Sequence, residues 1–137
     1  MTNKDDAHKL DEAIDHLTKS LDPSLRSGGV PDSKHGEKVF SEEKDAVNKL
    51  VELIKDKKSN IPDATLLGFI NRLVAADHAL AKAAINQATS TPGAKPEQLK
   101  DASKEFDKAY QLFLDGKYVD AIEHYKNAWQ HAQEAVK

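Results

Sequence analysis

The residues of this chain best suited to chemistry are histidines, which can act as bases or as metal ligands. There are six of them: His8, His16, His35, His78, His124 and His131. No HExxH motif occurs and no histidine follows a glutamate by three positions, so the usual zinc-protease and di-iron signatures are absent. His124 and His131 share a helical face but lie about 10 Å apart. A metal site there needs a ligand from another helix; the alternative is two packed rings.

Asp77 is a carboxylate in an otherwise apolar helical stripe. The other members of this stripe are Leu66, Ile70, Leu73, Leu80 and Ala84. Because burying an unpartnered carboxylate is costly, we expect Asp77 to have partners or to reach water. It is either a structural hydrogen-bonded polar group, a group that transfers a proton, or part of a small-ligand site. Such a site would draw on nearby histidines and a tyrosine: His78, His124, His131 and Tyr125.

Other catalytic signatures are missing. The chain has no cysteine and no GxSxG motif, so nucleophilic catalysis has little support. No GxxxxGK or GxGxxG phosphate loop occurs, and no cofactor is indicated. Asp22 and Asp32 are candidate metal ligands for a loop-bound calcium, although the spacing is not that of an EF-hand. With one candidate acid or base, we expect no catalytic residues and no enzyme activity.

Helices must position these residues, because apolar side chains recur in steps of three and four along most of the chain. The expected helices span residues 3–21, 37–56, 62–89, 96–115 and 118–136. The predicted inward faces include Ile14, Trp129 and Val136. The third helix, about 40 Å long, carries few charges, so we expect neighbours on more than one side. Two prolines and three glycines exclude regular structure from residues 22–36. The prediction is an all-α, antiparallel bundle of four to five helices with a long first loop, forming one domain over residues 1–137.

The composition limits the classes of partner that we expect this chain to bind. Twenty basic and 23 acidic residues are interspersed with a net charge of -3, so we expect no nucleic acid to bind. No apolar run approaches the roughly 18 residues of a membrane span, so we expect no membrane insertion. The first twelve residues are polar and acidic, unlike a signal peptide, and the absence of cysteine leaves the compartment open.

The segment from 109 to 129 resembles the second half of a tetratricopeptide repeat. The matching residues are Gly116, Tyr118, Ala121, Ile122, Tyr125 and Ala128. In that family the small residues lie where the two helices touch, and the aromatic residues fill the space around them. Glu105 and Ala109 depart from the pattern in the first half. Only one repeat is visible, whereas arrays need three or more.

Most of the chain also resembles a helical module of multidomain extracellular proteins from bacteria and archaea. The segments that carry this resemblance are AIDHLTKSLDPSL, SKHGEKVF, RLVAADHALAKAAINQA and GKYVDAIEHYKNAWQHAQ. The resemblance implies an accessory, extracellular domain and brings no site residues. We therefore expect a non-catalytic module that spaces or stabilises other domains, or that binds a protein partner or a neighbouring domain. The alternative is a bundle that binds a small ligand or a divalent metal.

Overall fold

The computed structural model describes residues 4–20, 26–27, 30–31, 36–56 and 61–137. Its elements are α1 (Lys4–Ser20), β1 (Arg26–Ser27), β2 (Val30–Pro31), α2 (Glu37–Lys55), α3 (Asp63–Thr89), α4 (Pro96–Leu114) and α5 (Tyr118–Ala135). The expected all-α bundle is confirmed. Within the described residues, no helix is both long and apolar enough to cross a membrane.

Local sequence signals set the helix ends. Pro62 precedes α3 and Pro96 is the first residue of α4, where a missing N–H and a fixed φ are tolerated. Gly116 has φ of 78° in the turn between α4 and α5, a conformation that other L-residues rarely adopt. The starts of α3 and α4 and the turn between α4 and α5 therefore follow from residues within a few positions of them.

The expectation that residues 22–36 lack all regular structure is wrong for four of them. Arg26 pairs with Pro31 and Ser27 with Val30 in a two-residue antiparallel ladder. In the sequence, two glycines separate the paired residues, and Gly-Gly is a dipeptide typical of tight hairpins. The glycine pair is the feature of the sequence from which this hairpin could have been predicted.

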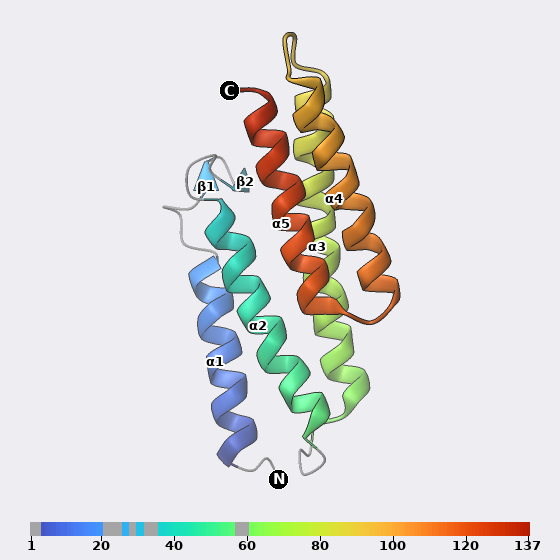
Figure 1. Cartoon of the computed structure of the whole chain (residues 1–137). Helices are drawn as coiled ribbons and strands as arrows, with labels where there is room; N and C mark the ends of the chain where they lie inside the picture. Colours follow the sequence, from blue (N-terminus) through green and yellow to red (C-terminus); the bar gives the residue numbers. More distant parts are fainter. Residues whose placement is uncertain (1–3, 21–25, 28–29, 32–35, 57–60) are drawn as a thin grey trace.

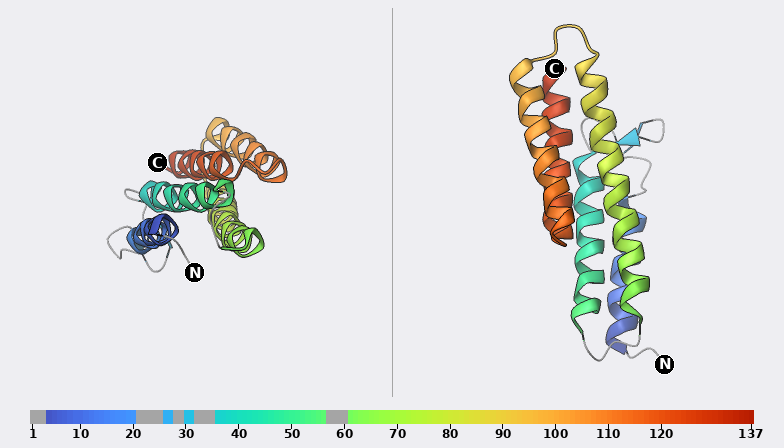
Figure 2. Two further views of the ribbon diagram at one scale, coloured as in Figure 1. Left: turned by 90° about the horizontal axis from the view of Figure 1, so that it is seen from below. Right: turned by 90° about the vertical axis from the view of Figure 1, so that its right-hand side faces the viewer.

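The helices form two antiparallel hairpins joined by one long helix (Figure 1). The hairpin of α1 and α2 lies toward one end of the molecule, and the hairpin of α4 and α5 lies toward the other. The 27-residue α3 runs beside both of them (Figure 2). Since five helices alternate in direction, α1 begins at one end of the molecule and α5 finishes at the other (Figure 1).

The core lies where α3, α2 and α5 meet. The buried residues of α3 form one stripe: Leu66, Ile70, Val74, Asp77, Ala81, Ala84 and Ala88. Between α2 and α5, the rings of Phe40 and Trp129 lie 5.8 Å apart, and Lys44 Nζ lies 2.9 Å from the Glu123 carboxylate. Trp129 is 4% exposed, which confirms its predicted inward position.

The outermost helix, α1, packs against α2. Among the described residues, two ion pairs that involve lysine cross this seam: Lys9 with Glu52 at 3.9 Å, and Glu12 with Lys49 at 2.8 Å. The hydrogen bond from Lys49 lowers the pKa of the Glu12 carboxyl and raises that of the lysine. A step of three residues along α1 matches a step of three back along α2, which fixes an antiparallel register.

The predicted inward positions of two residues are wrong. Ile14 is 57% exposed, because α2 covers only part of the apolar face of α1. Val136 is 43% exposed because it follows the last residue of α5. The expectation for α3 is met in part: it touches α2, α4 and α5, yet Phe69 remains 50% exposed.

Two glycine substitutions should have opposite effects on stability. Gly116→Ala should lower the free energy of unfolding by about 1 kcal/mol, because alanine disfavours a positive φ. Gly68→Ala should raise it by about 0.5 to 1 kcal/mol, because Gly68 lies inside α3 and an added Cβ meets no atom within 4 Å. Urea denaturation of both variants measures the two changes. Shifts of the same sign would contradict the turn geometry.

Candidate functional site

Three of the predicted site residues come together in one place. Asp77 and His78 are neighbours on α3, and Tyr125 faces them from α5. His78 Nδ1 lies 2.9 Å from the Tyr125 hydroxyl, a hydrogen bond between residues 47 positions apart. Asp77 is fully buried beside this pair, and its charge acts on the Tyr125 hydroxyl. The apolar stripe of α3 correctly singled out Asp77.

Aromatic rings surround the His78 side chain. Its ring centroid lies 4.7 Å from that of Phe106, 5.4 Å from Tyr125 and 6.1 Å from Tyr110. The rings of His78, Tyr110 and Tyr125 border a pocket of about 190 Å³, which Val74, Ala75 and Phe113 complete. Among the described residues that line it, the side chains with hydrogen-bonding groups are His78, Tyr110 and Tyr125.

Burial keeps this hydrogen-bonded pair neutral. It raises the pKa of Tyr125 to about 12, with smaller contributions from Tyr110 and Asp77. It also lowers the pKa of His78, and the nearby Lys82 ammonium adds to that effect. A neutral phenol and a neutral imidazole can hold each other or a polar ligand atom.

The other predicted histidines lie on the opposite seam, between α4 and α5. His124 Nδ1 hydrogen-bonds to Glu105, and His131 Nδ1 lies 2.8 Å from the Gln98 amide oxygen. Each histidine therefore has its own partner on α4. Among the described residues, neither belongs to a group of three metal-ligating side chains.

The candidate calcium ligands cannot be placed. Asp22 and Asp32 lie outside the described residues.

A second hollow was not predicted from the sequence. It is a groove of about 230 Å³ whose walls are α1 and α3 and whose floor is α2. The lining is Leu10, Ala13, Ile14 and Leu17 of α1, Leu50 of α2, and Phe69, Arg72 and Leu73 of α3. Ile14 and Phe69 are at least half exposed on facing walls. The available signal was the apolar flank of α3 outside its buried stripe.

A third hollow, of about 320 Å³, lies between α2 and the turn that joins α4 to α5. Lysines line it from both sides, Lys55 and Lys117, and it contains none of the predicted site residues. It therefore adds no candidate chemistry.

No known protein family, curated protein or solved structure matches this chain. Function is therefore inferred from the geometry described above.

The buried Tyr125 hydroxyl should make stability fall at alkaline pH. Its pKa is about 12 in the folded chain and 10 in the unfolded chain, so its contribution is complete below pH 10 and is lost as the pH rises toward 12. The loss should reach about 2 kcal/mol at pH 12. Tyr125→Phe removes this part of the pH dependence, and Tyr118→Phe should retain it. Urea denaturation from pH 7 to 11.5 measures the difference, and parallel profiles for wild type and Tyr125→Phe would contradict it.

Proposed function

We propose that this chain is a non-catalytic helical module that binds a protein partner through the groove between α1 and α3. The observation that carries the proposal is the pair Ile14 and Phe69, exposed to 57% and 50% on facing walls of an apolar hollow. Exposed apolar patches of this kind mark interaction surfaces on folded proteins. The surrounding helices are otherwise amphipathic, with charged outer faces.

The size of the groove favours side chains of a partner over a small molecule. Drug-sized ligands occupy pockets of roughly 300 to 1,000 Å³. The groove, at about 230 Å³, and the His78 pocket, at about 190 Å³, both fall below that range. A volume of this size instead suits one or two large apolar side chains that anchor a protein interface.

The occupant that fits best is an amphipathic helix. Its apolar face would lie on Leu50 between the two walls, in the manner of helix-in-groove recognition. Arg72 lies exposed on the α3 wall and pairs with no acidic side chain among the described residues. A partner helix with an acidic residue beside its apolar anchors would complement that charge.

This proposal includes the accessory role implied by the resemblance to helical modules of multidomain proteins. The partner helix would then belong to a neighbouring domain or to a separate protein. A spacing or stabilising role does not depend on the groove. A variant that lacks the groove should therefore lose partner binding but keep a spacing or stabilising role.

Selection from a displayed library of 20-residue amphipathic peptides tests the groove. Peptides enriched on the wild-type chain should lose about tenfold or more in affinity for Ile14→Glu and for Phe69→Glu, a change of at least 1.4 kcal/mol. Enriched peptides should carry an acidic residue, and Arg72→Glu should weaken their binding to the chain. Fluorescence anisotropy gives the affinities.

Leu114→Glu is the matched control, because Leu114 is also 57% exposed but does not line the groove. It should leave peptide affinity unchanged. The proposal is wrong if no peptide is enriched, or if Leu114→Glu weakens binding as much as Ile14→Glu. Sedimentation identifies a competing occupant: a dimer that Ile14→Glu dissociates would mean that a second copy fills the groove.

A further inference from the structure

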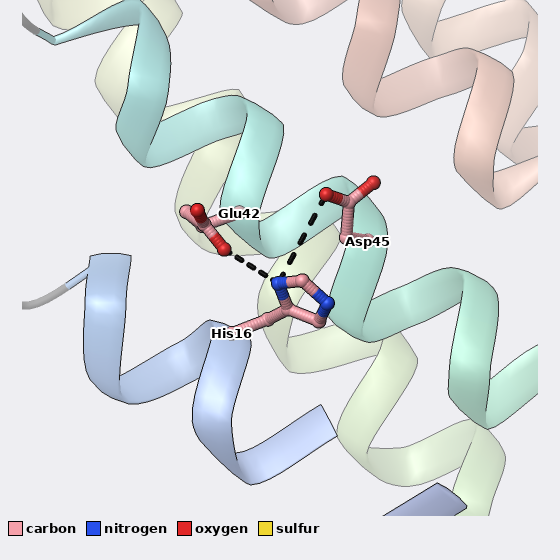
Figure 3. A group of neighbouring side chains, drawn as sticks. All are labelled: His16, Glu42 and Asp45. Carbon is pink, nitrogen blue, oxygen red and sulfur yellow. Dashed lines mark hydrogen bonds and ion pairs between the residues drawn. The ribbon is translucent and has the colours of Figure 1, made fainter. Parts of the chain in front are cut away.

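One set of side-chain contacts between α1 and α2, here called a rung, differs from the ion pairs farther along the same seam. His16 of α1 faces Glu42 and Asp45, which lie one turn apart on the same side of α2 (Figure 3). His16 Nδ1 lies 2.5 Å from the Glu42 carboxylate and 3.9 Å from that of Asp45. Both carboxylates therefore converge on a single ring nitrogen.

The charges of this rung do not balance. The ion pairs farther along the seam, Lys9 with Glu52 and Glu12 with Lys49, each match one ammonium to one carboxylate. Here two carboxylates face one imidazole, which is uncharged unless it is protonated. Among the described residues, no lysine or arginine lies within ion-pair distance of either carboxylate.

The neighbouring lysines are already engaged. Lys19 pairs with Asp15 at 3.0 Å, and Lys49 pairs with Glu12 at 2.8 Å. A metal ion that joined the rung would therefore replace the hydrogen bond between His16 and Glu42 and would displace no lysine from it.

The spacing of the three groups suits a small divalent metal. A ring nitrogen and carboxylate oxygens, each about 2.1 Å from a tetrahedral ion, lie about 3.4 Å from one another. The observed separations of 2.5 and 3.9 Å bracket that value. All three potential ligand atoms lie within 4.8 Å of one another. The Glu42 side chain is 13% exposed, so its surroundings hold it in place. The Asp45 side chain is 51% exposed, so it can adjust its position to a metal ion.

We propose that His16, Glu42 and Asp45 form a binding site for Zn²⁺ or a similar first-row divalent metal. One imidazole and two carboxylates are donors that zinc takes, whereas calcium and magnesium require shells made of oxygen. Three protein ligands leave a fourth position for water. The bound ion would link α1 to α2 at the end of the seam farthest from Lys9 and Glu52. This proposal is independent of the peptide-binding groove.

Titration of the whole chain with ZnCl₂ tests the site. Calorimetry should show one saturable ion per chain, and CoCl₂ should give a visible absorption band that zinc abolishes. His16→Gln should weaken zinc binding by about tenfold or more, since it removes one of three ligands. Mg²⁺ and Ca²⁺ should not compete at the same concentrations.

Two other histidine variants serve as controls. His124→Gln removes a histidine that hydrogen-bonds to one carboxylate, Glu105, and His8→Gln removes one that pairs with Glu12 on the same helix as His16. Both should keep the zinc affinity of the wild-type chain. Asp45→Asn keeps the test decisive if His16→Gln loses helicity, because the half-exposed Asp45 can change without altering packing.

The proposal is wrong if wild type shows no saturable zinc binding. It is also wrong if His16→Gln and Asp45→Asn, both folded by circular dichroism, bind zinc as tightly as wild type. A loss of binding in His124→Gln equal to that in His16→Gln would place the ion elsewhere.

Discussion

Burial of one stripe along α3 is the constraint on which the rest of the structure depends. The lower part of the stripe, around Leu66 and Ile70, packs next to α2, and the upper part, from Asp77 to Ala88, packs next to α4 and α5. Neither hairpin could cover all of α3 alone, because each is shorter than its 27 residues. The two hairpins are therefore offset along the axis. That offset leaves one flank of α3, including Phe69, facing the outermost helix across a groove.

Much of the fold could be read from the sequence because its signals are local. Pro62, Pro96 and Gly116 set helix ends through their own backbone geometry, which no distant residue has to supply. The alternating three and four spacing likewise identified the buried faces that carry Trp129 and Asp77. The same pattern failed for Ile14, because periodicity shows which face is apolar and not how many helices cover it.

The candidate sites were harder to predict because each depends on register between helices. Asp77 stood out as a carboxylate in an apolar stripe, but its tyrosine neighbour lies on a helix about 50 residues later. His16 is one of six histidines until α1 and α2 are aligned, and only then do Glu42 and Asp45 lie opposite it. The ion pairs between α1 and α2 are consistent with only this register of the two helices. Because exposed ion pairs contribute little to stability, their main effect is to select one alignment of the two helices.

The opposite positions of the start of α1 and the end of α5 have a mechanical consequence. Because α1 begins at one end of the bundle and α5 finishes at the other, tension applied through the ends acts along the helix axes. It loads the seam between α1 and α2 in shear, so the rungs of Lys9, Glu12 and His16 resist together. A helical hairpin pulled apart from one end would instead break such contacts one at a time. An odd number of alternating helices therefore directs such a load along the helix axes rather than across them.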